Sequence, residues 1–453
     1  MMDYEAALRA IFKRTDFERQ NQPPYSERVY RLSRMEELLA QFGNPQRAYV
    51  SVHVAGTKGK GSVTAMIEAI LRAAGYRTGM YTSPHLHTFR ERIQADGQLI
   101  SEEELARLVE RMAPVLDARP EVTVFEVITA LAMCYYAERG VQVGVFEVGL
   151  GGRLDATNVL LPLVSVITSI SLDHVKVLGD TLEAIAREKA GIIKPGVPVV
   201  TAPQRSEALA VVRRTAAERG APLVEVGRDW RWRARGADAG GQRLDVFRPG
   251  SGGAPEYPDL HLPLLGMHQL ENACAAVAAV AVLQERGMAV PEDAVRRGLE
   301  QVQWPGRLEV LGRRPWVVVD GAHNVYSLER LLSAIGALLE YRRLILVVGI
   351  GVTHSPRDLL AALLPAAATV FVTRSRHVRA TLPEELAALA QELGREAVVT
   401  HSAAEALSAA LGAAAADDLV LTTGSLFVVA EAREAWARLQ GLPLPPSDPP
   451  GVY

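Results

Sequence analysis

A glycine-rich turn that carries two lysines holds the residues of this chain best suited to binding phosphate. It follows an apolar run at residues 50–54 and precedes residues 63–71, where apolar side chains recur at helical spacing. Glycines let backbone N–H groups approach phosphate oxygens, and a helix N-terminus adds a positive partial charge. Lys60 would supply a mobile charge for the β- and γ-phosphates. The pattern predicts a nucleotide-binding loop, with an ordinary strand-to-helix turn as the alternative. The loop comprises Gly56, Thr57, Lys58, Gly59, Lys60, Gly61 and Ser62.

Acidic and imidazole side chains follow two further apolar runs. Glu147 closes the run at 143–146 and is followed by glycines, and Asp173-His174 follows the run at 163–167. The carboxyl ends of parallel strands are where open α/β sheets bind ligands. Glu147 could hold Mg²⁺ beside phosphate oxygens, with an exposed strand-closing glutamate as the alternative. His174 could contact a metal or phosphate, although a lone histidine is usually structural.

Lys189 falls on the apolar side of a short predicted helix, so it needs a partner or a lowered pKa unless the helix is solvated.

Arg307 lies near a predicted domain junction, from which it could reach phosphates. Asp320 ends an apolar run and is followed by His323 and Asn324. An aspartate at that place can accept from a ribose hydroxyl or a substrate amine, and an Asx-type turn is the alternative.

Strands alternate with helices along the chain, which predicts a mainly parallel sheet with helices on both faces. We expect strands at 48–54, 79–81, 143–148, 163–167 and 197–201, helices at 102–116, 125–139, 267–287 and 291–301, and a β excursion at 229–262. A second series of strands follows Trp304-Pro305-Gly306, at 316–320, 344–349, 368–373, 397–400 and 418–422. The predicted organisation is a first domain at 1–303, a Rossmann-like domain at 304–440 and a flexible proline-rich tail at 441–453.

Composition narrows the class of protein. The net charge of −3 over 453 residues argues against nucleic-acid binding. The two cysteines lie in apolar helical patterns, so we expect buried thiols and a reducing, cytoplasmic setting. The N-terminus lacks an apolar core, and no run of about 18 apolar residues occurs, so neither a signal peptide nor a membrane partner is expected.

Eleven strings lie between residue 42 and residue 429. They are FGNPQ, HVAGTKGKGSV, YTSPHL, ERI, FEVGLGGRLDATN, SLDHVKVLGDT, REKAGIIKPG, LLGMHQLENACAA, GRLEVL, VDGAHN and TGSLFVV. Together and in this order they are highly specific, and by them the chain resembles the folylpolyglutamate synthase/dihydrofolate synthase family, within the Mur ligase superfamily.

The resemblance implies a fold and a reaction. The fold would be an N-terminal P-loop-type parallel-sheet ATPase domain, like the central domain of Mur ligases, plus a C-terminal Rossmann-like glutamate ligase domain. ATP would phosphorylate a carboxylate, and the amine of L-glutamate would attack the acyl phosphate to release ADP and phosphate. The substrate would be a folate, with dihydropteroate left open as a second acceptor. Separately from the resemblance, we expect a monomer.

The resemblance also assigns residues. The loop Gly56 to Ser62, with Asn272, Arg307 and Asp320, would contact ATP. Ser83 and Glu147 resemble ligands of one Mg²⁺ and His174 a ligand of a second. Lys60, Lys189 and His323 match catalytic positions, and Lys189 matches a lysine that is carbamylated. The positions that map onto the pterin pocket or lie near glutamate are Thr123, Phe125, Arg153, Leu154, Asp155, Ala156, His323 and Ser425.

The sequence departs from the usual family pattern at three places, and three other functions are weighed against the one that the resemblance implies. Lys58 stands where the family usually has asparagine, Val325 stands where proline is usual, and the acidic cluster often seen near His354 is missing. The alternatives are a Mur-type ligase for another carboxylate, a small-molecule kinase, and a nucleotide-binding module without catalysis. The strings around Ser83 and Arg153 favour folate. A kinase would not need the DGAHN motif or Lys189, and the joint presence of Lys60, Glu147, His174 and Lys189 speaks against a non-catalytic module.

Overall fold

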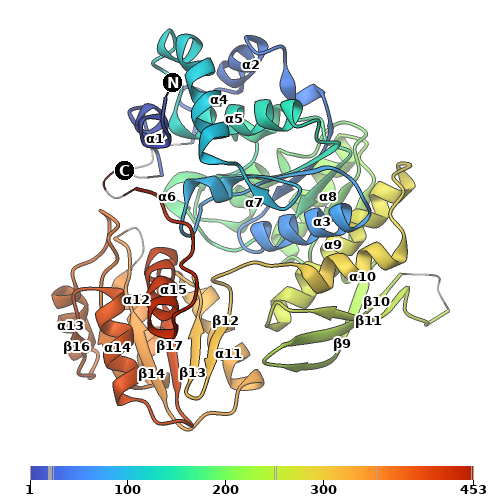
Figure 1. Cartoon of the computed structure of the whole chain (residues 1–453). Helices are drawn as coiled ribbons and strands as arrows, with labels where there is room; N and C mark the ends of the chain where they lie inside the picture. The colour runs from blue at the N-terminus through green and yellow to red at the C-terminus, as the bar shows by residue number, and fades with distance from the viewer. Residues whose placement is uncertain are drawn as a thin grey trace.

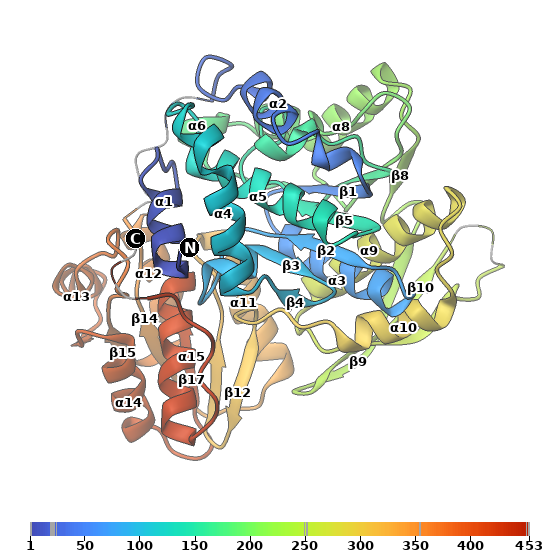
Figure 2. The same ribbon diagram turned by 45° about the horizontal axis from the view of Figure 1, so that its top comes forward.

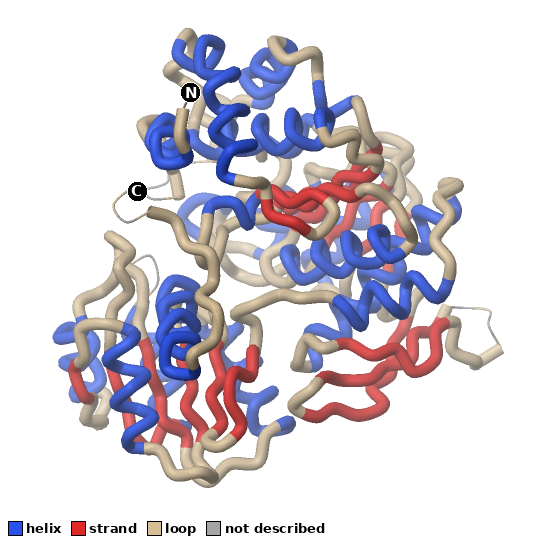
Figure 3. The backbone as a smooth tube through the Cα atoms, viewed as in Figure 1, coloured by secondary structure: helices blue, strands red, loops and turns tan. Residues whose placement is uncertain are grey.

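The computed structural model describes residues 2–18, 23, 25–248, 250, 252–352, 355–449 and 451, so His354 lies outside the described residues. The described strands form a large sheet, a small antiparallel sheet beside it and a separate C-terminal sheet (Figure 1 and Figure 3). The expected α/β architecture with two sheet-based units is therefore confirmed.

The large sheet has the order β4-β3-β2-β5-β1-β6-β7-β8, and its strands are parallel from β2 to β8. Its short edge strands β3 and β4 are antiparallel. Its members are β1 Val50–Ala55, β2 Thr78–Tyr81, β3 Ile93–Ala95, β4 Gln98–Leu99, β5 Val143–Glu147, β6 Val164–Ile167, β7 Val199–Thr201 and β8 Leu223–Glu225. All five expected strands are present with slightly shifted ends, whereas β3, β4 and β8 were not expected.

Side-chain alternation along the strands divides the core into two layers. Along β5, Val143 and Val145 pack against the layer of α3, α9 and α10, whereas Phe146 packs against the layer of α1, α2, α4 and α5. The helices are α1 Tyr4–Phe12, α2 Leu32–Ala40, α3 Lys60–Ala73, α4 Glu102–Asp117, α5 Val124–Glu138, α6 Val175–Leu178, α7 Leu182–Ala190, α8 Ser206–Glu218, α9 Met267–Glu285 and α10 Glu292–Gln301.

The expected β excursion is a three-stranded antiparallel sheet of β9 Arg231–Asp238, β10 Gly241–Phe247 and β11 Tyr257–Leu262. Its apolar side chains share one core with α9, and this explains why α9 is alanine-rich and buried nearly all round. Cys134 and Cys274 are buried free thiols, as expected.

The C-terminal sheet has the order β12-β13-β17-β14-β15-β16 and is parallel except for its edge strand β12. Its strands are β12 Glu309–Arg313, β13 Trp316–Val319, β14 Leu344–Val348, β15 Ala367–Val372, β16 Val398–Val399 and β17 Leu419–Thr423. Helices α11 Val325–Leu338, α12 Pro356–Leu363 and α13 Pro383–Glu392 cover one face. Helices α14 Ala403–Ala413 and α15 Leu426–Gln440 cover the other. The expected strands are present, and β12 was not expected.

Helix α1 and the C-terminal segment lie side by side at the N-terminal body (Figure 2). Residues 442–449 form no helix or strand, yet the Asp448 carboxylate accepts hydrogen bonds from the Tyr4 hydroxyl at 2.5 Å, the Thr88 hydroxyl at 2.6 Å and the Phe89 amide at 2.6 Å. The C-terminal segment thus connects the second sheet unit back to the first. None of the described helices is long and apolar enough to cross a lipid bilayer.

Candidate active site

A cavity of about 1150 Å³ lies between the two large sheets and is lined by residues of both. Its floor comes from the loops that follow β1, β5 and β6, three adjacent strands of the first sheet. Its opposite wall includes Asp320 and His323, which follow β13 in the second sheet. Both sheets therefore direct their ligand-binding edges at one space.

The glycine-rich loop leaves the N-terminus of α3 without a side-chain cap. Helix α3 begins at Lys60, and Gly59 precedes it with a φ of 89° and no capping hydrogen bond. The first N–H groups of a helix lack intrahelical acceptors, so this 14-residue helix presents donors and a positive dipole end to the cavity. These are the features that bind phosphate.

A chain of buried amides supports the loop from α9. The Asn272 side chain donates to Gln269 Oε1 at 2.9 Å, and Gln269 donates to the Ser62 hydroxyl at 3.3 Å. A Cβ atom at Gly59 would lie 2.4 Å from Asn272 Oδ1. The loop and Asn272 therefore fit together only because residue 59 has no side chain.

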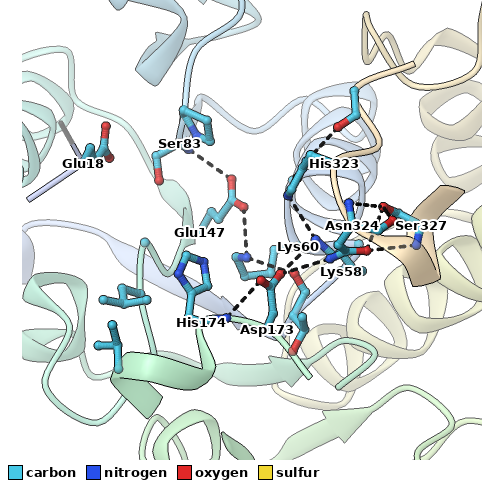
Figure 4. A pocket seen from close by; sticks show the side chains of 18 of the residues that line it. Glu18, Lys58, Lys60, Ser83, Glu147, Asp173, His174, His323, Asn324 and Ser327 are labelled. Carbon is cyan, nitrogen blue, oxygen red and sulfur yellow. Dashed lines mark hydrogen bonds and ion pairs between the residues drawn. The ribbon is translucent and has the colours of Figure 1, made fainter. Parts of the chain in front are cut away.

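Glu147 lies beside the loop with one oxygen toward Lys60. Lys60 Nζ is 3.8 Å from Glu147 Oε1, and the Ser83 amide donates to Glu147 Oε2 at 3.1 Å (Figure 4). Burial raises the pKa of Glu147, and Lys60 only partly opposes this effect. A bound cation would stabilise the charged form of this buried carboxylate.

The donor set fits Mg²⁺ held largely by phosphate oxygens. Among the described residues, no three His, Cys, Asp or Glu side chains gather at one metal-binding point. Mg²⁺ is commonly bound by one or two carboxylates with water and substrate phosphates completing its shell, so Glu147 beside the α3 N-terminus suits it. His174 lines the same cavity, and desolvation with the nearby Lys189 and Lys60 lowers its pKa to about 4 despite Asp173. Its imidazole is therefore neutral and able to bind a metal.

Lys189 is buried on α7, behind the phosphate loop. Its Nζ donates to the Gly56 carbonyl oxygen at 2.8 Å, and it forms no part of the cavity wall. Burial, with Lys60 and Lys58 nearby, lowers the pKa of Lys189 to about 7 although Asp173 opposes the shift. Near neutral pH the amine is partly unprotonated, which is the nucleophilic form.

Asp320 holds the turn between β13 and α11. Its carboxylate accepts from the Leu308 and Ala322 amides, each at 2.7 Å. Arg307 lies against the same turn, because a Cβ at Gly321 would come within 2.8 Å of Arg307 Nη1. Burial raises the pKa of Asp320, and Arg307 acts in the opposite direction. The Asx-type turn considered from sequence is therefore present in a residue that also lines the cavity.

Most of the residues mapped onto the pterin pocket belong to the cavity wall. Thr123, Phe125, Leu154, Asp155 and Ala156 line the cavity. Both Asp155 oxygens are already used, however, by the Thr157 amide and hydroxyl and by the Gly149 and Leu150 amides. Asp155 thus shapes the loop after β5.

Two residues mapped near substrate lie outside the cavity wall. Arg153 turns away and pairs with Glu188 at 3.0 Å and Glu27 at 2.9 Å. Ser425 caps α15 by accepting from the Phe427 amide at 3.3 Å. Phe427, which follows it, does line the cavity.

Sequence reasoning missed an ion pair on the cavity wall. Arg92 is buried in the first unit and pairs with Glu18, with Nη2 and Oε2 2.6 Å apart. Glu18 belongs to no motif, and its carbonyl accepts from Arg379 of the second unit. The one signal in the sequence was Arg92 itself, within the string ERI.

Known proteins match this chain over nearly its full length. Residues 54–280 match the Mur ligase middle domain, and residues 306–426 match the Mur ligase glutamate ligase domain. The dihydrofolate synthase/folylpolyglutamate synthase of Bacillus subtilis is 36% identical over 89% of this chain and 94% of its own. A probable bifunctional folylpolyglutamate synthase/dihydropteroate synthase of Haloferax volcanii is 37% identical over 96% of this chain, which spans 51% of that protein.

Solved structures agree with the sequence matches. Mycobacterium tuberculosis folylpolyglutamate synthase in complex with ADP has a TM-score of 0.85 and 33% identity, over 96% of this chain and 99% of its own. A folylpolyglutamate synthase complex with AMPPCP and folate has a TM-score of 0.81 and 33% identity, over 95% and 99%. The two domain matches, the long relatives and the geometry of the cavity place this chain in the folylpolyglutamate synthase/dihydrofolate synthase family of Mur ligases.

Proposed function

We propose that this protein is an ATP-dependent ligase that adds L-glutamate to a folate through an acyl phosphate. One observation carries the proposal: an uncapped α3 N-terminus with Lys60 and Glu147 shares a single cavity with Asp320 and His323 of the second sheet. Phosphorylation of the folate carboxylate needs a phosphate-binding edge, and attack by the glutamate amine needs a second polar edge. Structures of relatives with ADP and with AMPPCP and folate support the same pair of substrates.

The chemistry balances in two steps. A folate carboxylate oxygen attacks the γ-phosphorus of ATP, the bond from that phosphorus to the β–γ bridging oxygen breaks, and ADP leaves. The unprotonated glutamate amine then attacks the acyl carbon, and a carbon–nitrogen bond forms. The carbon–oxygen bond to phosphate breaks, phosphate leaves with the electron pair, and the nitrogen releases one proton to the departing phosphate or to solvent. Lys60 and the α3 N–H groups bind the phosphates. Arg307, at the junction with the second sheet, stabilises negative charge that develops in the reaction.

Bound Mg²⁺ would supply charge neutralisation at the phosphates, with Ser83 and Glu147 holding one ion and His174 a second. Lys189 carries a carbamate in our proposal, because its amine is buried and its pKa is about 7. The carbamate replaces a buried cation with an anion that faces the cationic loop. We further propose that the enzyme is a monomer that works in the cytoplasm.

The cavity also shields the acyl phosphate from water, since it is walled from both sheets. The first domain at 1–303 would hold ATP and folate, and the domain at 304–440 would close over them with the glutamate. His323 then stands beside the incoming amine.

The test is ADP release measured with ATP, L-glutamate and either tetrahydrofolate or dihydropteroate, each omitted in turn. We expect release to require both co-substrates, with a product heavier by one glutamyl residue. Product from dihydropteroate would add dihydrofolate synthase activity. A stable phosphorylated product without glutamate would instead identify a kinase, and glutamate-dependent release with another carboxylate alone would identify a different Mur-type ligase.

A further inference from the structure

The two lysines of the phosphate loop point in different directions. Lys60 Nζ lies toward Glu147 of the first sheet, whereas Lys58 Nζ lies 2.9 Å from Asp173 Oδ2 and 3.2 Å from His323 Nε2 (Figure 4). His323 is 265 residues away from Lys58 in sequence and belongs to the opposite wall of the cavity. Lys58 therefore bridges the loop to the second sheet.

The hydrogen bonds of His323 define its tautomer. Nδ1 is 2.8 Å from the Gly321 carbonyl oxygen, which can only accept, so Nδ1 carries the hydrogen. Nε2 faces the ammonium of Lys58, which can only donate, so Nε2 offers its lone pair. These contacts assign His323 the neutral Nδ1–H tautomer, with Nε2 directed at Lys58.

Asp173 keeps Lys58 in this position. Its side chain is 13% exposed and that of Lys58 23% exposed, so both ends of the ion pair are shielded from solvent. The Asn324 amide also lies 3.5 Å from Asp173 Oδ2, which adds a second link to the opposite wall.

An ammonium has three donor hydrogens, and the described residues accept two of them at Lys58. The third is available to a phosphoryl oxygen on the loop. A single side chain can thus touch the transferred phosphoryl group, Asp173 and His323 at once.

We propose that Lys58 is a positioning residue: it ties a phosphoryl group on the loop to the orientation of His323, and so readies the glutamate side of the cavity. The kinetic role of Lys58 rests on the proposed ligase function, whereas the contact between Lys58 and His323 does not depend on it. Lys60 serves the nucleotide, and Lys58 serves the step in which the amine attacks.

The first test is nuclear magnetic resonance of the full chain with ¹⁵N-labelled histidine and no substrates. His323→Gln identifies the His323 signals among the ten histidines. We expect a neutral Nδ1–H tautomer in the parent protein and an altered Nε2 shift, with the other tautomer populated, in Lys58→Met. Unaltered His323 signals in Lys58→Met would overturn the proposal.

The second test is kinetic and uses Lys58→Met, Lys58→Arg and Lys60→Met. Lys58→Met should lower kcat/KM for glutamate by at least about tenfold while the Kd for ADP stays within about twofold, and Lys58→Arg should recover part of the loss. Lys60→Met should weaken ADP binding directly. Lys13→Met is the charge-matched control, because Lys13 forms an exposed ion pair with Asp117 outside the cavity.

A double-mutant cycle separates positioning from independent roles. If Lys58 acts through His323, Lys58→Met combined with His323→Ala is no slower than the worse single variant. Multiplicative losses, or a Lys58→Met variant that weakens ADP binding as Lys60→Met does, overturn the proposal. If the parent protein ligates no glutamate, the proposed function is wrong. The histidine signals still decide whether Lys58 orients His323.

Discussion

Replacing Gly59 by alanine tests how the phosphate loop depends on its backbone. Gly59 has a φ of 89°, and a Cβ there would lie 2.4 Å from Asn272 Oδ1. The left-handed backbone alone costs an alanine about 1–2 kcal/mol. The new methyl group also pushes Asn272 away from Gln269, and a lost hydrogen bond with a buried amide left unpaired adds about 1–3 kcal/mol.

Gly75 provides a matched control. Its φ is 91°, and a Cβ there would meet nothing within 4 Å. Gly75→Ala therefore carries the backbone strain without the collision, and it lies after α3, away from the cavity.

The assay pairs urea unfolding with equilibrium binding of ATP or a non-hydrolysable analogue. We expect Gly75→Ala to lose about 1–2 kcal/mol of unfolding free energy with unchanged nucleotide affinity. Gly59→Ala should lose more stability and bind nucleotide at least about tenfold more weakly, which corresponds to about 1.4 kcal/mol. Equal nucleotide affinity in the two variants would refute the role given to the Gly59–Asn272 contact.

Further predictions concern Glu147 and His174, Lys189, and Asp448. Glu147→Gln, and separately His174→Ala, should raise the Mg²⁺ concentration needed for half-maximal turnover and slow turnover by at least about tenfold, or 1.4 kcal/mol of barrier; an unchanged Mg²⁺ titration would remove that residue from the metal site. Because the pKa of Lys189 falls from 10.5 to about 7, its neutral fraction grows as pH rises through 7, and so should a ¹³C carbamate signal at constant dissolved CO₂. The same signal in Lys189→Arg would contradict the assignment. For the uncarbamylated chain, the unfolded state binds more protons between pH 7 and 10.5, so stability rises with pH in that window. Asp448→Asn should lower the free energy of unfolding by about 1–3 kcal/mol, since three donors lose a charged acceptor. Asp117→Asn, in an exposed ion pair, is its control, and equal stabilities would show that the C-terminal segment contributes nothing there.

The loop at Gly56 to Ser62 and the place of Glu147 could be predicted from sequence because both follow from local order along the chain. An apolar β-branched run, glycines and a helical repeat specify a strand, a turn and a helix start within a few residues. Burial of Lys189 was one of two alternatives that the sequence left open, and it was favoured by the apolar neighbours of this lysine on a short helix.

Contacts between distant segments could not be predicted in this way. Lys58 was recognised as an added charge, but its contact with His323 depends on how two separate sheets pack. Glu18 pairs with Arg92 from an N-terminal segment that contains no motif. A local arrangement also escaped the sequence: Asp155 lines the cavity, and both its carboxylate oxygens accept hydrogen bonds within its own loop.

Strands at the sheet edges escaped the sequence pattern for a related reason. β12 pairs antiparallel with β13, and its residues are all partly or fully exposed, so it lacks the buried apolar run that marked the central strands. β8 is short and its first residues are half-buried. The central strands were found because burial on both faces makes them apolar throughout.

An acyl phosphate intermediate predicts that an oxygen atom passes from the folate carboxylate to the released phosphate. Folate labelled with ¹⁸O in the reacting carboxylate is incubated with enzyme, ATP and L-glutamate, and the phosphate released is analysed by mass spectrometry. Because a carboxylate oxygen becomes the bridging oxygen of the acyl phosphate, each phosphate released should carry one ¹⁸O atom, and Lys60→Ala should release none. Unlabelled phosphate from a reaction that still forms the glutamyl amide would rule out an acyl phosphate formed from the folate carboxylate.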